Sequence, residues 1–329
     1  MSENSTNPLD GPSLSIVLPV YHERDLVGAV VGEIHELLQD LATDYEIIAV
    51  DDGSDDGSYE VLRDLMQTGH IPLKIARHLE NRGNGAALRS GIRAASKDVV
   101  VTMDADGQHS PTDILKLIAE IPPYDLVIGA RTSNYRGPWH RTMANGFYNW
   151  FASWLSGHRV LDLTSGFRAM RRKAVLHFLP LFPSGFSAPT TTTLSFLKAG
   201  YNVKFVPIEV GPRQAGESKI RIWRDGVAFF TLILRMIMLY DPLRIFLPMA
   251  LVLAALGAFA AAAGMIQAGR LVLANSAIFL FISSLLTGLL GLVSGQISST
   301  LVQYHGDETL MVEAGPELPK KAGSPRELD

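Results

Sequence analysis

The sequence contains no cysteine, and this absence removes several kinds of chemistry from consideration. Disulfide bonds, zinc–thiolate sites, iron–sulfur ligation and thiol nucleophiles all require cysteine. Only 19% of the residues are charged and the net charge is −4, so the chain lacks the basic excess that nucleic-acid binding would favour. Residues 1–12 have neither a basic nor an apolar segment, and we interpret them as a disordered leader rather than a signal peptide.

Hydrophobic residues make up 47% of the chain, and two almost wholly apolar runs hold much of the excess, at residues 243–266 and 271–295. Each run is long enough to cross about 30 Å of hydrocarbon as a helix, and the short connection between them predicts a transmembrane hairpin. The alternative is a pair of buried helices in a soluble domain, although such helices rarely lack charge over about 20 residues.

The charged residues around the hairpin predict its orientation. The connection carries one arginine, Arg270, whereas basic residues are frequent beyond the other ends of the spans: Arg221, Arg224, Arg235, Arg244, Lys320, Lys321 and Arg326. By the positive-inside rule, both termini and the domain that precedes the hairpin are cytoplasmic. The sequence therefore predicts a multi-pass integral membrane protein, ending in a flexible cytoplasmic tail over residues 304–329.

Residues 222–242 link this domain to the hairpin and contain both charged and aromatic side chains. We interpret the segment as an amphipathic helix that lies on the bilayer surface, and Pro242 ends it before the first span. The alternative is a helix that packs against the cytoplasmic domain.

The cytoplasmic domain, predicted over residues 13–221, alternates strand-like and helix-like segments. Short apolar runs predict strands at 15–20, 46–50, 73–77, 98–103 and 125–128. Helical spacing between them implies an α/β fold with a doubly wound, mostly parallel sheet, which binds ligands at the carboxyl ends of its strands. The four threonines at 190–193 predict a β-rich packing segment.

Asp104 and Asp106 follow the fourth predicted strand two residues apart, so in extended backbone both could face one side. Gln108 adds an amide oxygen, and hard oxygen ligands suit Mg²⁺ or Mn²⁺. A divalent ion would neutralise the charge that grows on a departing diphosphate. An Asp-x-Asp pair alone is more often a turn or a cap, but its place after the strand favours a metal site.

Two further polar motifs follow predicted strands. Asp51 and Asp52 could accept hydrogen bonds from a base or a ribose, with a turn and helix cap as the alternative. Residues 81–88 place glycines at the start of a helix, which suits phosphate binding. A dinucleotide fingerprint is excluded because Leu88 replaces the third small residue and the motif follows the third strand.

Taken together, the motifs resemble those of family-2 glycosyltransferases of GT-A fold. The chain is most similar to the polyprenyl-phosphate glycosyltransferases, the dolichol-phosphate mannose synthase and GtrB-like group. The resemblance covers residues 13–240 and rests on segments 19–23 (PVYHE), 50–54 (VDDGS), 83–91 (GNGAALRSG), 103–106 (MDAD), 162–168 (DLTSGFR) and 213–219 (RQAGESK).

The resemblance implies three sets of site residues. The nucleotide would contact Pro19, Tyr21, Glu23, Asp51, Asp52 and Asp104. The metal ion, Mg²⁺ or Mn²⁺, would be held by Asp104, Asp106 and Gln108. The acceptor phosphate would be bound by Arg131, Arg136, Arg168, Arg213, Ser218 and Lys219, and the catalytic residues would be Asp106, Arg131, Arg213 and Lys219. A structural ion pair for Arg168 and a solvated loop for Ser218 and Lys219 are the alternatives.

The same resemblance implies transfer of a sugar from a UDP- or GDP-sugar to a dolichyl or undecaprenyl phosphate. Direct displacement would invert the anomeric centre, and a retaining double displacement through a carboxylate nucleophile is the alternative. The acceptor oxygen is already anionic, so no strong base is required. By analogy with GtrB-like proteins the chain would form a homo-tetramer. The alternatives are a processive polysaccharide synthase, which typically adds a Gln-x-x-Arg-Trp motif and more spans, and a scaffold that has lost its metal ligands.

Overall fold

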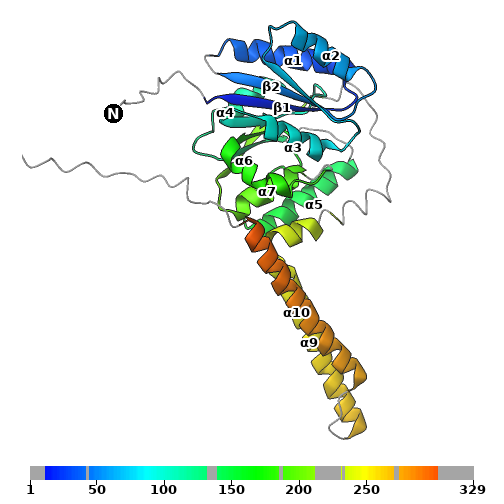
Figure 1. Cartoon of the computed structure of the whole chain (residues 1–329). Coiled ribbons are helices and arrows are strands. Elements are labelled where there is room, and N and C mark those ends of the chain that lie inside the picture. The colour runs from blue at the N-terminus through cyan, green and yellow to red at the C-terminus, as the bar shows by residue number, and fades with distance from the viewer. Residues whose placement is uncertain are drawn as a thin grey trace, which may run out of the picture.

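One mixed sheet forms the centre of the part of the chain that the structure describes (Figure 1). The structure is a computed structural model, and it describes residues 12–41, 44–131, 139–184, 188–211, 231, 234–269 and 274–302. The strand order is β3-β2-β1-β4-β6-β5-β7. The strands are β1 (Leu14–Val20), β2 (Tyr45–Asp51), β3 (Leu73–Arg77), β4 (Val99–Thr102), β5 (Leu126–Arg131), β6 (Arg168–Arg171) and β7 (Val203–Ile208).

The α/β prediction is confirmed, because every neighbouring pair of strands is parallel except the two pairs that β6 makes. The five predicted strands are β1 to β5, whereas β6 and β7 were not predicted. Helices connect the strands on both faces of the sheet: α1 (Arg24–Gln39), α2 (Ser58–Gln67), α3 (Asn84–Ala94), α4 (Asp113–Ile118), α5 (Trp139–Ser156), α6 (Arg172–Phe178) and α7 (Ala188–Lys198).

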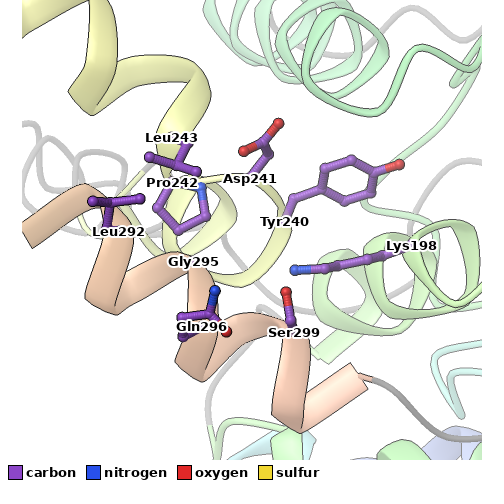
Figure 2. Close-up of a pocket in the computed structure, with 9 residues that line it drawn as sticks. All are labelled: Lys198, Tyr240, Asp241, Pro242, Leu243, Leu292, Gly295, Gln296 and Ser299. Atoms are coloured by element: carbon purple, nitrogen blue, oxygen red, sulfur yellow. The ribbon is translucent and has the colours of Figure 1, made fainter. Parts of the chain in front are cut away.

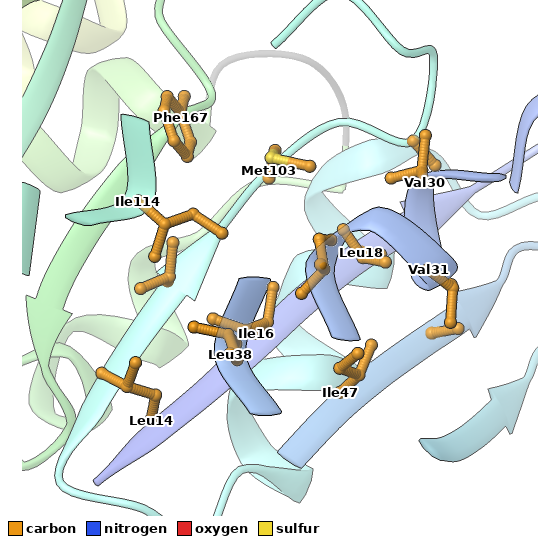
Figure 3. Packing of buried hydrophobic residues seen from close by; sticks show 14 of the residues in the cluster. Leu14, Ile16, Leu18, Val30, Val31, Leu38, Ile47, Met103, Ile114 and Phe167 are labelled. Atoms are coloured by element: carbon orange, nitrogen blue, oxygen red, sulfur yellow. The ribbon is translucent and has the colours of Figure 1, made fainter. Parts of the chain in front are cut away.

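Side-chain alternation along β1 divides the core into two layers. Leu14, Ile16 and Leu18 point into the layer under α1, where they meet Leu38 (Figure 3). Val17 points the other way, into a layer that α3, α6 and α7 cover with Ala87, Ile92, Val175, Phe178 and Phe196. Strands buried on both faces read as continuous apolar runs, which is why the sequence signal for them is strong.

The threonine run at 190–193 lies in α7, so the prediction of a β-rich segment is wrong. All four threonines are buried. The hydroxyls of Thr192 and Thr193 donate hydrogen bonds to Ala188 O at 2.8 Å and Pro189 O at 3.0 Å, one turn earlier. Satisfying the hydroxyls within the helix lets β-branched residues remain in a buried α-helix.

Two long helices, α9 (Leu243–Ala268) and α10 (Asn275–Val302), form a hairpin that projects from the domain (Figure 1). Both are long and apolar enough to cross a membrane, and only 17% and 11% of their most apolar windows are buried. This exposure argues against the alternative of two core helices. The helices pack closely, because a Cβ on Gly291 would lie 2.6 Å from the Phe246 Cβ.

The segment predicted as an interfacial helix, 222–242, is described only in part. Residues 234–240 are helical, and Met236 and Ile237 are buried in a cluster with Phe151 and Leu155 of α5. The described end of this segment therefore packs against the domain, as the alternative interpretation expects. The rest of the segment lies outside the described residues.

The foot of the hairpin is joined to the domain through α7. The Lys198 ammonium at the end of α7 donates hydrogen bonds to the Ser298 hydroxyl of α10 and to Leu239 O, the second at 3.1 Å. A pocket of about 380 Å³ opens beside this contact (Figure 2). It is lined by Lys198, Tyr240, Asp241, Pro242, Leu243, Leu292, Gly295, Gln296 and Ser299.

The buried carboxylate of Glu46, near the amino end of β2, connects three other segments of the chain. It accepts hydrogen bonds from the Ser15 hydroxyl at 2.6 Å and the Ser96 amide at 2.7 Å, and it pairs with Lys74. Burial alone would raise the pKa of Glu46, but the bonds from Lys74, Ser15 and Ser96 outweigh burial and lower the pKa to about 2. Glu46 thus stabilises the fold only while it is ionised.

The Glu46→Gln substitution tests this network. Because the folded-state pKa lies below the ordinary 4.5, the stabilisation is complete above pH 4.5 and is lost as the pH falls toward 2. We expect the full-length variant to be less stable than the wild type by on the order of 2 kcal/mol at neutral pH, with the difference vanishing in acid. Thermal unfolding in detergent across this pH range measures it. The exposed Glu36→Gln on α1 is the control, and an equal loss in both variants would contradict the network.

Candidate functional site

Polar side chains gather where the parallel strands β1, β2, β4 and β5 end. Tyr21 directly follows β1 and Asp52 directly follows β2. Asp104 lies just beyond the end of β4, and Arg131 is the last residue of β5. Since these strands run in the same direction, their carboxyl ends lie along one edge of the sheet. The structure thus places Tyr21, Asp52, Asp104 and Arg131 along one edge of the sheet.

The Tyr21 ring is presented at this edge. It is 43% exposed and stacks on the His22 ring with centroids 4.0 Å apart. His22 has a φ of 57°, unusual for a residue with a side chain, and its Nε2 lies 2.7 Å from the Asp55 carboxylate. The neighbouring Glu23 amide donates to the Ser58 hydroxyl at 3.0 Å. The loop after β1 is therefore tied to the loop after β2.

Asp52 organises the glycine-rich turn before α3. Its carboxylate accepts hydrogen bonds from the amides of Arg82 at 3.0 Å and Gly83 at 2.8 Å, and His78 Nδ1 lies 2.6 Å away. The other ring nitrogen of His78 lies 2.8 Å from the Ser90 hydroxyl. Contact between Asp52 and a nucleotide stays a prediction. His78, which the motifs did not point to, is the residue that links Asp52 to α3.

Asp51 is the last residue of β2, and its side chain is buried rather than exposed at the edge. It is fully buried, accepts a hydrogen bond from the Ser54 amide at 3.2 Å and pairs with Arg77 at 3.2 Å. The described contacts of its carboxylate are structural, and its contact with a nucleotide stays a prediction. Gly53 is required beside it, since φ is +75° and a Cβ would lie 2.6 Å from the Glu80 carbonyl carbon.

The residues predicted to hold a metal occupy the loop after β4. Asp106 accepts a hydrogen bond from the Gln108 amide at 3.1 Å, and the Gln108 side chain donates to Gly211 O at 3.3 Å. Asp104 lies against Gly166, where a Cβ would come within 3.2 Å of a carboxylate oxygen. A glycine at 166 thus leaves room for the Asp104 carboxylate.

The donor set fits a hard divalent ion. Two carboxylates and an amide oxygen are the ligand types that Mg²⁺ and Mn²⁺ prefer. The described residues contain no cluster of three His, Cys, Asp or Glu side chains that could bind a metal, and the binding of a metal by Asp104, Asp106 and Gln108 stays a prediction. His109 directly follows Gln108 in the sequence. Burial lowers the pKa of His109, although the charges of Asp104 and Asp106 act to raise that pKa.

Arg131 is held by a bidentate ion pair. Its Nε and Nη2 donate hydrogen bonds to the two carboxylate oxygens of Asp162 at 2.7 and 2.9 Å, and Nη2 also donates to the Thr164 hydroxyl at 2.7 Å. Burial acts to raise the pKa of Asp162, but Arg131 outweighs it and lowers that pKa. The Arg131 side chain stays 23% exposed, so a phosphate could still reach it.

One short loop, residues 162–166, connects the two halves of the site. It begins with Asp162, which holds Arg131, and ends with Gly166, which touches Asp104. The Thr102 hydroxyl of β4 donates to Gly166 O at 2.7 Å. A shift of this loop would move the predicted acceptor side and the predicted metal side together.

Arg168 is buried beside this loop and bonds to it, and its contact with the acceptor phosphate stays a prediction. Arg168 is 2% exposed, and it donates to Leu163 O, Ser165 O, Pro189 O and the Thr193 hydroxyl at 2.6–3.1 Å. Burial lowers its pKa to about 9 despite the nearby Asp162, so the guanidinium is still charged at neutral pH. A buried guanidinium whose bonds go to the protein is structural, though its partners are mainly carbonyls rather than the predicted ion pair.

Asn149 of α5 holds the same loop from the other side. Its side-chain amide donates to Leu161 O at 2.7 Å, and its carbonyl accepts from the Leu163 amide at 2.9 Å. These bonds bracket Asp162, so Asn149 fixes the backbone on both sides of the residue that holds Arg131. No motif pointed to Asn149, because a lone asparagine in a helix carries no spacing signal.

Pro19, a predicted nucleotide contact, lies within β1 in register with Val50 of β2, and its contact with a nucleotide stays a prediction. Four predicted residues of the acceptor side lie outside the described residues: Arg136, Arg213, Ser218 and Lys219. Their roles remain predictions from the sequence.

Comparison with known families identifies two matching regions. The family described as "Glycosyl transferase family 2" matches residues 15–179, about half of the chain. The family described as "GtrB C-terminal hairpin" matches residues 241–300, which includes most of α9 and α10. Both matches agree with the resemblance inferred from the motifs.

Curated relatives carry related names. An undecaprenyl-phosphate 4-deoxy-4-formamido-L-arabinose transferase of Aeromonas hydrophila is 31% identical over 65% of this chain and 64% of its own length. A polyprenol monophosphomannose synthase of Mycolicibacterium smegmatis is 28% identical over 62% of this chain and 80% of its own. The chain thus matches less than two thirds of the first of these relatives.

A solved structure shares the fold. Glucosyl-3-phosphoglycerate synthase of Mycobacterium tuberculosis, crystallised with Mn²⁺, UDP-glucose and phosphoglyceric acid, superposes with a TM-score of 0.54 at 21% identity. The match covers 69% of this chain and 79% of that protein. At this identity the likeness concerns the fold.

The Arg168→Met substitution tests the structural role of the buried guanidinium. It leaves the carbonyls of Leu163 and Ser165 without the guanidinium donor, whereas Pro189 O keeps the hydrogen bond from the Thr193 hydroxyl. We therefore expect a loss of about 2–5 kcal/mol in the free energy of unfolding. Arg172→Met is the matched control, because Arg172 donates to one carbonyl, Ala95 O, and its loss should be about 1 kcal/mol. Denaturant unfolding measures both. Equal stability of the two variants would contradict the assignment.

Proposed function

This chain belongs to glycosyl transferase family 2, and we propose that it transfers a sugar from a nucleotide-sugar donor to a polyprenyl phosphate at the cytoplasmic face of a membrane. The observation that carries the proposal is the edge where Arg131, held by Asp162, lies one loop away from Asp104. A cationic group for an acceptor phosphate and an acidic group for a metal-bound diphosphate are the two requirements of such a transfer.

The membrane part of the proposal is supported by the hairpin. The C-terminal match to the GtrB hairpin and the exposed apolar surfaces of α9 and α10 both indicate insertion into a bilayer. The printed names of the curated relatives specify undecaprenyl phosphate or polyprenol as the lipid. Since a polyprenyl phosphate keeps its headgroup at the interface, an enzyme that uses it must stand close to the bilayer.

The residues of the chain act mainly by position and charge. A phosphate oxygen of the acceptor attacks the anomeric carbon while the bond from that carbon to the diphosphate breaks, and the nucleoside diphosphate leaves with the electron pair. This direct displacement inverts the anomeric centre. The acceptor oxygen needs no general base because it is already ionised. Arg131 offsets the repulsion between the incoming phosphate and the donor, and Asp162 keeps its guanidinium oriented.

Asp104, Asp106 and Gln108 would hold the divalent ion, Mg²⁺ or Mn²⁺. The bound ion would neutralise the charge on the leaving diphosphate. The protein keeps these ligands in place through the bonds of Gln108 to Gly211 and the contact of Asp104 with Gly166. At the other end of the edge, the Tyr21 ring offers a stacking surface for a base, and the Asp52-bound turn presents the start of α3 toward phosphate.

The proposal is tested with membranes that contain the protein and with labelled UDP-glucose, UDP-N-acetylglucosamine or GDP-mannose. We expect label from one donor in a mild-acid-labile lipid, and Asp106→Asn should reduce the rate by about 100-fold or more. Asparagine keeps an oxygen for the Gln108 amide, so thermal stability should not change. The exposed Asp64→Asn on α2 is the control. Label in a polymer would favour the processive synthase, and full activity of Asp106→Asn would remove the metal assignment.

Arg131→Lys tests the acceptor side. Lysine keeps the charge but cannot form the bidentate pair with Asp162, so the cation is no longer oriented. We expect the KM for polyprenyl phosphate to rise by roughly 10–100-fold, while the affinity for the nucleotide is retained. Steady-state kinetics with each substrate varied in turn measures the split, with the exposed Arg93→Lys on α3 as control. A loss of nucleotide affinity with an unchanged KM for the lipid would place Arg131 on the donor side.

A further inference from the structure

The pocket at the foot of the hairpin has an apolar side and a polar side (Figure 2). Leu243 of α9 and Leu292 of α10 line the apolar side, whereas Lys198 of α7 and Gln296 and Ser299 of α10 line the polar side. Its volume of about 380 Å³ is within the range of small-molecule sites. Such a lining suits a ligand that has a polar head and an apolar chain.

The Lys198 ammonium has one donor to spare at this pocket. Two of its bonds are accounted for, to Leu239 O at 3.1 Å and to the Ser298 hydroxyl. An ammonium has three N–H donors, so among the contacts of the described residues the third is unused. Burial lowers the pKa of Lys198, although the charge of Asp241 acts to raise it. Because burial disfavours the charged form, an anion in the pocket would stabilise this ammonium.

Two more donors line the same pocket. They are the side-chain amide of Gln296 and the hydroxyl of Ser299, and the hydrogen bonds of the described residues include none from either side chain. Figure 2 shows both groups beside the Lys198 ammonium, with the Asp241 carboxylate directed away from them. That carboxylate accepts a hydrogen bond from the Arg244 amide at 3.3 Å. The polar side thus offers positive charge and hydrogen-bond donors.

The pocket lies at one end of both candidate membrane spans. These spans cover Leu243–Gln267 and Asn275–Thr300, so the pocket is formed by the start of the first and the end of the second. Spans of 25 and 26 residues are longer than the roughly 20 residues that a hydrocarbon core requires. In an inserted hairpin, the ends of the spans therefore reach the layer of lipid headgroups.

We propose that this pocket binds the phosphate of a membrane phospholipid. The phosphate oxygens would accept hydrogen bonds from Lys198, Gln296 and Ser299, and the lipid chains would cover Leu243 and Leu292. Charge-assisted bonds to phosphate are among the stronger hydrogen bonds in proteins, and basic pockets between helices at a membrane surface suit lipid headgroups. Free phosphate offers the same oxygens but would leave the apolar side uncovered. This inference rests on the proposed membrane insertion of the hairpin.

A lipid bound here would bridge the domain and the hairpin. Lys198 is the last residue of α7, whereas Gln296 and Ser299 belong to α10. The same phosphate would contact both helices and reinforce the bond that Lys198 already makes to Ser298. The proposed lipid is therefore a structural ligand of this junction, separate from the acceptor of the proposed reaction.

Native mass spectrometry of the full-length protein in dodecyl maltoside tests the site by counting bound lipids. The probes are phosphatidylglycerol and a diacylglycerol with the same chains, which lacks the phosphate. We expect one phosphatidylglycerol per chain to bind saturably and more tightly than the diacylglycerol. A variant with Gln296→Leu and Ser299→Ala loses two donors, so its Kd for phosphatidylglycerol should rise by about 10-fold or more. Lys198 is kept because it holds α10.

The control variant carries Gln267→Leu and Ser276→Ala, exposed positions at the other end of the hairpin, and should bind as the wild type does. Wild-type affinity in the Gln296 and Ser299 variant would place the lipid elsewhere and overturn the inference. Equal binding of the diacylglycerol would show that apolar contact alone holds the lipid, and displacement by millimolar inorganic phosphate would identify a site for free phosphate. Either result would make the inference wrong.

The test is independent of the proposed transfer reaction. Binding is measured without sugar donor or acceptor, so a failure of the lipid site leaves the transferase proposal standing. Flotation of the protein with phosphatidylcholine vesicles tests the insertion of the hairpin separately. If the protein does not float, the membrane hairpin itself is overturned, and the lipid site with it.

Discussion

The bidentate ion pair between Arg131 and Asp162 is the interaction on which the arrangement of the site depends. It closes the 162–166 loop onto the end of β5, and the same loop sets Gly166 against the Asp104 carboxylate. Residues 162–166 lie in neither a helix nor a strand, so side chains must bond their peptide groups. Asn149 from α5 and Arg168 from beneath supply those bonds. The 162–166 loop therefore sets the distance between Arg131 in the cationic half of the site and Asp104 in the acidic half.

The charges near this loop suit two anionic substrates at once. Asp162 lies close to two guanidinium groups, those of Arg131 and Arg168, so this end of the edge has a surplus of positive charge. Asp104 and Asp106 place negative charge at the other end of the loop. In the proposed reaction the first would attract the acceptor phosphate, and the second would attract a metal cation. The buried Arg168 would add its charge to the site without competing with Arg131 for the acceptor.

The sequence patterns predicted the elements that have a regular apolar pattern. They did not predict the roles of residues that act through a contact with a distant residue. Strands β1 to β5 are apolar runs, because both faces of the sheet are covered, whereas β6 begins with Arg168 and β7 contains Lys204 and Pro207. The Asp104 and Asp106 pair could be located from residue type and strand position alone. The burial of Arg168 and Asp51 could not, because an arginine or aspartate in a motif looks the same whether its partner is a ligand or a carbonyl. Asn149 and His78 act through single contacts with distant residues, which leave no pattern in the chain.

Two helices link the foot of the hairpin to the loop that holds Arg131. Helix α7 bonds α10 through Lys198 and, near its other end, accepts the Arg168 guanidinium at Pro189 and Thr193. Helix α5 bonds α9 through Leu155 and Arg244 and bonds the loop through Asn149. Because a helix is stiff along its axis, each of the two helices fixes the position of the 162–166 loop relative to the hairpin. In the proposed reaction the acceptor is a polyprenyl phosphate, whose headgroup stays at the interface. The height of Arg131 above the lipid would then decide whether the acceptor is reached, and these two links would set that height.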